Sequence, residues 1–420
     1  MSKPTFRTFG CKLNYYETET MKQLCDKEGL QNITVINSCA VTAEAVRKAK
    51  KIIRRSSRET PSKKIIVTGC AAQVEPELFN SMNEVDFVIG NEKKLSSATW
   101  SKIKQARSAE SVVSKVDVND IMSVNKLNPW EITKLANRSR AYVQIQNGCD
   151  HRCTFCIIPY GRGNSRSVPE KKVLSQVQKL VNNGFKEIVL TGVDITSWGN
   201  DLPTSLKLGS LVKKILSEVT ELPRLRLSSI DSIEVDEELT DLIVSEQRFM
   251  PHLHLSLQSG DNLILKRMKR RHTREQAINF CKTIQLQRPE VTFGADIIAG
   301  FPTENELMFQ NSLELINECN LTWLHVFPFS ARAGTPASRM PTVYGTEIKS
   351  RANQLRVIGQ NTIIKHLDSQ LGVRQSVLIE GNGKGRTETF AEAVVDPTLK
   401  SGTIVNLVAH QHDGSKLFCS

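Results

Sequence analysis

Apolar and amphipathic stretches alternate from the start of the chain. Apolar strand patterns at 5–9, 33–37 and 64–68 are separated by helical patterns near 15–28 and 42–57. A strand–helix–strand order of this kind gives parallel strands joined by right-handed crossovers. We therefore predict an open parallel α/β domain over residues 1–105.

The same alternation resumes after residue 139 and continues for more than two hundred residues. Helical patterns separate six apolar strand patterns there. The strand patterns lie at 141–147, 187–191, 224–229, 252–258, 292–298 and 321–327, and the helical patterns near 169–183, 204–219, 236–246, 273–288 and 303–318. Six units are too few for a closed eightfold barrel. The pattern predicts a partial (β/α)6 barrel within residues 139–367, open on one side to admit a large substrate.

Two further segments differ from both α/β patterns. The stretch 106–138 lacks strong periodicity and is rich in Ser, Asn and charge, so we predict an inter-domain linker. After a helical pattern near 346–370, the tail over 368–420 has short strand patterns separated by glycine turns. Such a tail is typical of a small β-barrel. The predicted fold class is therefore α/β with a C-terminal β-barrel.

The composition indicates the class of protein and the compartment in which it is found. The chain has 420 residues, of which 39% are hydrophobic, as expected of a folded protein. It has no apolar leader and no run of eighteen apolar residues, so we expect a cytoplasmic protein without a membrane partner. In a reducing compartment, ten cysteines in a chain of this length indicate metal or catalytic thiols rather than disulfides.

The chain is basic, with a formal charge of +12 and a pI near 9.2. A solvated basic face is one explanation and a polyanionic partner is the other. Clustering favours nucleic acid, because the basic side chains gather in two places. The first cluster contains Arg47, Lys48, Lys50, Lys51, Arg54, Arg55 and Arg58, and the second contains Lys266, Arg267, Lys269, Arg270, Arg271 and Arg274.

Three cysteines lie close together in one loop. Cys149, Cys153 and Cys156 follow the apolar run 142–145. Three thiolates can hold three irons of a four-iron cubane and leave the fourth iron open to substrate or cofactor. A zinc knuckle or a set of buried thiols is the alternative, but no paired CxxC or HxxxH completes a tetrahedral site. We expect His151, inside the loop, to be solvated.

A second set of three cysteines follows the first three strand patterns. Cys11, Cys39 and Cys70 each come just after a strand, and parallel strands end at the same edge of a sheet. We therefore expect these thiols to converge on a second cluster, although each alone could be a small buried residue. The remaining cysteines have no partner spacing and are predicted to be packing or surface thiols: Cys25, Cys281, Cys319 and Cys419.

Polar residues and glycines at later strand ends predict a cofactor pocket at the carboxyl edge of the barrel. Glycine permits a close backbone approach, and the polar side chains can hydrogen-bond a ligand. Ordinary turn glycines and capping residues are the alternative. The candidates are Gly192, Asp194, Ser256, Gln258 and Asp296, with Gly260 as a further possible wall.

Three parts of the chain resemble known families. The loop around Cys149, Cys153 and Cys156 resembles the CxxxCxxC motif of radical S-adenosylmethionine (SAM) enzymes. Residues 8–14, 36–45 and 67–73 resemble the N-terminal domain of methylthiotransferases, although the segment between Gly29 and Ile33 is several residues shorter than usual. The segment 385–388 and Phe390 resemble the TRAM domain, an RNA-binding barrel.

The resemblance implies a tRNA methylthiotransferase with SAM and two [4Fe-4S] clusters. It implies that the loop cluster on Cys149, Cys153 and Cys156 cleaves SAM to a radical, and that the auxiliary cluster on Cys11, Cys39 and Cys70 holds the sulfur. No other side chain is assigned a catalytic role. The implied partners are the anticodon stem-loop of tRNA, an electron donor such as flavodoxin or ferredoxin, and a sulfur source.

The substrate branch follows from a shorter motif. The run 39–45 followed by Arg47 and Lys48 resembles the bacterial branch that acts on N6-threonylcarbamoyladenosine at position 37 of tRNA. Methylthiolation of N6-isopentenyladenosine or of a ribosomal-protein aspartate are alternatives within the family. A non-catalytic, zinc-holding RNA-binding protein is an alternative from another class.

Overall fold

The computed structural model describes residues 2–106, 114–127, 139–204 and 206–420, which form two compact units. The first unit comprises Met1–Ile132, Gln146–Val168 and Ser330–Ser338, and the second comprises Thr133–Ile145, Pro169–Phe329 and Arg339–Ser420. The units are therefore interleaved along the chain, whereas the predicted domain ranges are consecutive. The cysteine loop belongs to the first unit.

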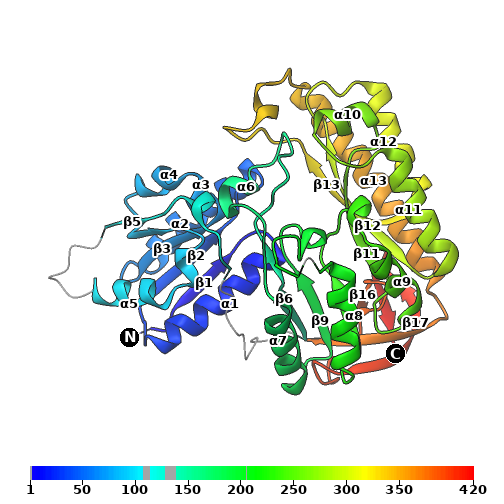
Figure 1. Ribbon diagram of the computed structural model, residues 1–420, viewed down its shortest axis with the longest axis horizontal. Coiled ribbons are helices and arrows are strands. Elements are labelled where there is room, and N and C mark those ends of the chain that lie inside the picture. Colours follow the sequence, from blue (N-terminus) through cyan, green and yellow to red (C-terminus); the bar gives the residue numbers. More distant parts are fainter. Residues whose placement is uncertain (1, 107–113, 128–138, 205) are drawn as a thin grey trace. The chain divides into compact units, whose positions relative to one another are not determined.

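A five-stranded parallel sheet forms the centre of the first unit (Figure 1). Its strands lie in sequence order: β1 (Thr5–Thr8), β2 (Ile33–Ser38), β3 (Lys64–Gly69), β4 (Phe87–Ile89) and β5 (Val116–Asp117). The first three were predicted. β4 and β5 were not, and β5 lies within the segment predicted as a linker. Much of that segment, including Pro129 and Trp130, lies outside the described residues.

Helices cover both faces of this sheet because each has one apolar side. Val46 and Ile53 of α2 (Ala43–Glu59) pack on one face, together with the short helices α3 (Cys70–Val74) and α4 (Pro76–Asn80). Met21 and Leu24 of α1 (Lys12–Lys27) pack on the other face beside α5 (Ser97–Gln105). The three-layer arrangement leaves the carboxyl ends of the strands available for a site.

Six parallel strands form the partial barrel of the second unit. β6 (Arg140–Gln144), β9 (Glu187–Thr191) and β10 (Arg224–Leu227) make one sheet, and β11 (His252–Gln258), β12 (Thr292–Ala299) and β13 (Leu321–Pro328) make another. Parallel bridges from Leu225 to Phe249 and from Ile230 to Leu255 join the two sheets. This confirms the predicted fold class.

Helices follow the barrel strands in the predicted order. The five expected helices are α7 (Glu170–Asn182), α8 (Leu208–Glu218), α9 (Glu237–Ser245), α11 (Arg274–Gln287) and α12 (Glu306–Glu318). The short α10 (Asn262–Arg267) was not predicted. None of the described helices combines the length and the apolar character needed to cross a membrane.

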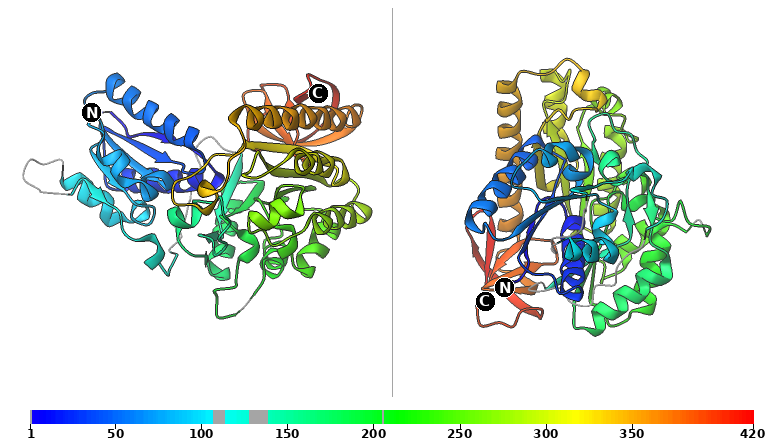
Figure 2. Two further views of the ribbon diagram at one scale, coloured as in Figure 1. Left: turned by 90° about the horizontal axis from the view of Figure 1, so that it is seen from above. Right: turned by 90° about the vertical axis from the view of Figure 1, so that its left-hand side faces the viewer.

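A closed five-stranded barrel ends the chain, beside the long helix α13 (Gly345–Ser369) (Figure 2). Its strands are β14 (Arg374–Gly381), β15 (Lys384–Thr387), β16 (Glu392–Val394), β17 (Ile404–His412) and β18 (Lys416–Cys419). Leu367 of α13 is part of its apolar core. The predicted C-terminal β-barrel is therefore present.

The loop after β15 packs against the strands of the partial barrel. The Phe390 ring stacks on His252 with centroids 4.5 Å apart, and the guanidinium of Arg226 lies 5.3 Å from the same ring. Arg226 also donates to the Thr387 carbonyl at 2.9 Å, and the indole of Trp323 donates to the Thr389 carbonyl at 3.2 Å. Residues in the segment that resembles a TRAM domain thus contribute to packing within the second unit.

Candidate metal centres

The N-terminal cysteines lie at the carboxyl ends of three adjacent strands. Cys11 immediately precedes α1, Cys39 directly follows β2, and Cys70 is the first residue of α3. Gly10 has a φ of +96°, and a Cβ at this position would lie 3.0 Å from the Cys39 Sγ. Glycine is needed there for both reasons. The sheet therefore brings Cys11 close to Cys39, as the strand pattern predicts.

These thiols differ in exposure. Cys11 is exposed, whereas Cys39 and Cys70 are 8% and 3% exposed. Burial, reinforced by Cys70, raises the pKa of the Cys39 thiol to about 12. A metal binds the thiolate, so metal binding here would release the proton that Cys39 otherwise keeps.

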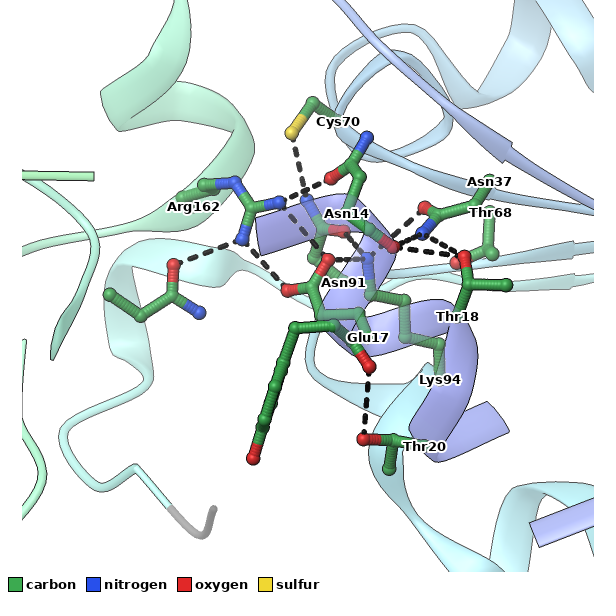
Figure 3. Close-up of polar contacts among 12 residues, drawn as sticks. Asn14, Glu17, Thr18, Thr20, Asn37, Thr68, Cys70, Asn91, Lys94 and Arg162 are labelled. Carbon is green, nitrogen blue, oxygen red and sulfur yellow. Dashed lines mark hydrogen bonds and ion pairs between the residues drawn. The ribbon is translucent and has the colours of Figure 1, made fainter. Parts of the chain in front are cut away.

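Buried cations lie beside the N-terminal cysteines (Figure 3). Arg162 and Lys94 are almost fully buried, and both form ion pairs with Glu17. Burial acts to lower the pKa of Arg162, but Cys70, Glu17 and Cys11 together hold it well above its ordinary value. Cations at this position fit a cluster held by thiolates, because such a centre is anionic. The donor set therefore agrees with an iron–sulfur cluster.

A short antiparallel ribbon holds the cysteine loop. β7 (Gln146–Asn147) pairs with β8 (Arg166–Ser167), and the loop between them contains Cys149, Cys153 and Cys156, all partly exposed. The guanidinium of Arg152 donates to the Cys149 carbonyl at 2.7 Å and to the Asn164 side chain at 2.7 Å. The Arg152 side chain thus joins two parts of the loop, while the three cysteines stay partly exposed.

Candidate cofactor-pocket residues lie on the second unit. Gly192 follows β9, and Asp194 accepts a hydrogen bond from the Thr196 hydroxyl at 3.2 Å. Ser256 and Gln258 are on β11, whose last residue, Gln258, has a φ of +71°. Their role in binding SAM stays a prediction.

Asp296, the fifth candidate, lies between two histidines from neighbouring strands. Its Oδ1 is 2.9 Å from His254 Nε2 and 3.3 Å from His325 Nδ1. Burial acts to raise the pKa of Asp296, but the two imidazoles more than offset this effect and hold it below its ordinary value. The sequence analysis assigned no role to either histidine. The structure shows that the Asp296 carboxylate is held by these two rings.

The two basic clusters differ in the structure. On α2, Arg47, Lys48, Lys51, Arg54 and Arg55 are exposed on the side opposite the buried Val46 and Ile53. In the second cluster, Arg270 pairs with Asp231, Arg271 with Glu234, and Arg274 with Glu318. Arg270 and Arg274 are therefore largely buried in ion pairs of the second unit. The α2 cluster is exposed along most of its helix, and its role as an RNA-binding surface stays a prediction.

The sequence prediction missed the polar residues around the N-terminal cysteines. Asn14, Glu17, Asn91 and Lys94 are buried, and Arg162 joins them from the segment after the cysteine loop. The sequence contained one indication of this network. On α1, Asn14 and Glu17 lie on the same side as Leu13, Met21 and Leu24. A polar residue on the apolar side of a helix often belongs to a buried hydrogen-bond network.

The chain matches two family models. The Radical SAM superfamily matches residues 143–316, and the uncharacterized protein family UPF0004 matches residues 3–90. The threonylcarbamoyladenosine tRNA methylthiotransferase MtaB of Rickettsia prowazekii is 49% identical over 397 residues, which cover 94% of this chain and 92% of that protein. The protein of the same name in Bacillus subtilis is 34% identical, with 88% and 83% covered.

A more distant relative and a solved structure complete the comparison. The tRNA-2-methylthio-N(6)-dimethylallyladenosine synthase of Ehrlichia chaffeensis is 30% identical over 90% of this chain and 88% of that protein. The structure of the radical SAM methyltransferase TsrM from Kitasatospora setae, with cobalamin and a [4Fe-4S] cluster bound, has a TM-score of 0.56 at 12% identity. It covers 89% of this chain and 76% of that chain, and at this identity it shows similarity of fold alone.

Proposed function

Because the chain belongs to the methylthiotransferase family of radical SAM enzymes, we propose that it converts N6-threonylcarbamoyladenosine at position 37 of tRNA to its 2-methylthio derivative. The relative at 49% identity carries the name of this activity, and it supports this substrate over N6-isopentenyladenosine, since the relatives named for the dimethylallyl substrate are 29–31% identical. The cofactors are SAM and [4Fe-4S] clusters.

The reaction explains why two cysteine sets are needed. The hydrogen on carbon 2 of adenine is not acidic enough for a side-chain base to remove. When bound, the clusters and SAM would supply a 5′-deoxyadenosyl radical for this hydrogen, a sulfur for insertion and, from a second SAM molecule, the methyl group. Cys149, Cys153 and Cys156 would hold one cluster, and Cys11, Cys39 and Cys70 the other. The protein otherwise has to bind the RNA, orient the base and exclude water.

Partners and compartment follow from this activity. The substrate is the anticodon stem-loop of tRNA, whose unstacked nucleotides are the usual targets of base-specific RNA recognition. An electron donor such as flavodoxin or ferredoxin reduces the loop cluster, and a separate sulfur source renews the sulfur that each turnover consumes. The cytoplasm, where tRNA is modified, is the expected compartment.

A nucleoside assay tests the substrate. The reconstituted, reduced protein is incubated with SAM and with tRNA carrying either N6-threonylcarbamoyladenosine or N6-isopentenyladenosine, and the digested nucleosides are analysed by mass spectrometry. We expect the 2-methylthio product from the first tRNA and little from the second. Product from the second tRNA alone would assign the chain to the other tRNA branch. Product from neither tRNA, but from a ribosomal protein, would replace the RNA substrate.

The exposed cluster on α2 is the proposed tRNA-binding surface. Three of its arginines form ion pairs with carboxylates that are themselves partly or fully exposed: Arg47 with Glu44, Arg54 with Glu84 and Arg55 with Glu59. Exposed pairs of this kind contribute little to stability, so phosphate groups can replace the carboxylates. The face is therefore available for RNA.

Neutralising this surface is expected to weaken tRNA binding. Changing Arg47, Lys51, Arg54 and Arg55 together to Ala should lower the slope of log affinity against log salt by about three units if all four contact phosphates. A filter-binding series over salt concentration measures this slope. The matched control changes four exposed lysines of the second unit to Ala: Lys171, Lys172, Lys186 and Lys213. Equal losses in both variants would mean that only net charge matters and that α2 is not the binding surface.

A further inference from the structure

Three charged side chains are buried together beside the N-terminal cysteines (Figure 3). Glu17 lies on α1, Lys94 in the turn before α5, and Arg162 at the end of the short helix α6 (Ile158–Arg162). Their side chains are 1%, 0% and 2% exposed. The Glu17 carboxylate accepts from Lys94 Nζ at 2.6 Å and from Arg162 Nη1 at 2.8 Å.

The contacts of Lys94 are those of an ammonium group, although burial lowers its pKa from the ordinary value despite the neighbouring Glu17 carboxylate. Its Nζ donates to Glu17 Oε2 at 2.6 Å, to Asn91 Oδ1 at 2.7 Å and to Asn37 Oδ1 at 3.3 Å. These three acceptors match the three hydrogens of an ammonium, whereas a neutral amine would have one hydrogen too few. The Asn37 amide is oriented independently, because its Nδ2 donates to the Asn14 carbonyl at 2.9 Å.

One amide separates this charge from a cysteine. Asn91 accepts from Lys94 through Oδ1, and its Nδ2 lies 3.7 Å from Cys70 Sγ and also donates to the Gly161 carbonyl. Its backbone N–H donates to the Gln73 side chain at 2.8 Å, which fixes the residue from the other side. The positive charge of Lys94 therefore acts on Cys70 through a rigid, low-dielectric contact.

Arg162 contacts the same edge from the segment after the cysteine loop. It donates to both Glu17 oxygens, to Asn147 Oδ1 at 3.0 Å and to Asn14 Oδ1. The Asn14 amide in turn donates to the Phe9 carbonyl at 2.6 Å and to the Ser38 carbonyl at 3.1 Å. Through Asn14, Arg162 is thus connected to the backbone just before Cys11 and just before Cys39.

The charges of this group do not cancel. Two cations and one carboxylate leave a net charge of +1 among these three buried side chains. A buried charge without a counter-charge is strongly destabilising, so we expect an anionic group next to it. Cys70 lies next to this group, because Asn91, which accepts from Lys94, has its Nδ2 at 3.7 Å from the Cys70 Sγ. The network is therefore built to face negative charge at the cysteine site.

We propose that Glu17, Lys94 and Arg162 are positioning residues that set the reduction potential of the auxiliary cluster on Cys11, Cys39 and Cys70. A nearby cation stabilises the more negative, reduced cluster and raises its potential, and a nearby carboxylate lowers it. This inference rests on the ligand set of the proposed function. It goes further, because it assigns a role to buried residues that are not metal ligands.

The test uses the full-length protein with only one cluster site. In a background in which Cys149, Cys153 and Cys156 are Ala, the anaerobically reconstituted protein is titrated with redox mediators, and the reduced cluster is followed by electron paramagnetic resonance. Lys94→Met is expected to lower the potential and Glu17→Gln to raise it. Each shift should be about tenfold in the equilibrium constant for reduction, or about 59 mV for one electron. A merely structural role would not give shifts of opposite sign.

Two further variants provide an alternative to Lys94→Met and a matched control. Asn91→Asp keeps the size of the side chain and adds one negative charge beside Cys70, so it should lower the potential even if Lys94→Met does not fold. Lys64→Met is the matched control, because Lys64 is the first residue of β3, at the strand end opposite Cys70, and is expected to leave the potential unchanged.

The outcomes separate the two hypotheses. A background protein that binds no iron would overturn the ligand set of the proposed function. A background protein that binds about four irons, but whose potential is unchanged or shifts in one direction in both Lys94→Met and Glu17→Gln, would overturn the role of the network and leave the ligand set intact.

Discussion

Replacing Cys149, Cys153 and Cys156 together with Ala is expected to halve the iron content of the reconstituted protein and to abolish reductive cleavage of SAM. The reason is that each set of three cysteines suits one four-iron cluster, so the intact chain should bind about eight irons. All three cysteines of the loop are partly exposed, whereas Cys39 and Cys70 of the other set are buried, so we expect the loop cluster to present its open iron to SAM. Iron analysis and chromatography of 5′-deoxyadenosine measure the two effects.

A matched control removes three other cysteines. Cys25, Cys281 and Cys319 are all buried, and their replacement with Ala should leave the iron per folded chain unchanged. Full iron content in the loop variant would show that the loop holds no cluster. A colourless intact protein with stoichiometric zinc would instead favour the non-catalytic RNA-binding alternative.

Replacing Cys11, Cys39 and Cys70 with Ala is expected to separate radical formation from sulfur transfer. The variant should still make 5′-deoxyadenosine under reducing conditions, because the loop cluster is intact, but it should yield no methylthiolated nucleoside. The measurement is mass spectrometry of both products from one reaction. Methylthiolation at the unmodified rate would contradict the auxiliary-cluster assignment.

This second variant also changes the local charge. Removing the three thiols also removes the anionic cluster that we expect them to hold, which leaves Lys94 and Arg162 with Glu17 as their one anionic partner among the buried side chains described above. An uncompensated buried charge is destabilising, so the variant should unfold at a lower temperature than the loop variant, whose cysteines are partly exposed. Circular dichroism of both variants therefore accompanies the product assay. A lower activity without any loss of folded protein is the informative result.

Helices and strands with a clear hydrophobic periodicity have bounds close to the predicted ones. The apolar run at 292–298 corresponds to β12 (Thr292–Ala299), and the helical pattern near 273–288 corresponds to α11 (Arg274–Gln287). β4 and β5 have only three and two residues. Strands this short carry no recognisable alternation, and they exist because the backbone of β3 offers a partner to β4, and β4 to β5.

The two basic clusters of the sequence differ in how far their side chains are exposed in the structure. The basic residues of α2 remain exposed because an amphipathic helix on a sheet has one solvent face. In the second cluster, Arg270 donates to Asp231, 39 residues earlier in the chain, and is largely buried. The sequence shows which charged residues are close along the chain. Only the packing of strands and helices decides which of them form ion pairs with carboxylates.

The sequence by itself determined the ends of the first three strands and therefore that Cys11, Cys39 and Cys70 lie at the same edge of the sheet, since parallel strands joined by short crossovers must end at one edge. It also determined the spacing of the cysteine loop. Only the tertiary structure decided that Arg162 contacts Glu17 across 145 positions and that Lys94 contacts it across 77. Such contacts leave no periodic trace in the sequence, because each residue needs its partner only after the fold has buried both.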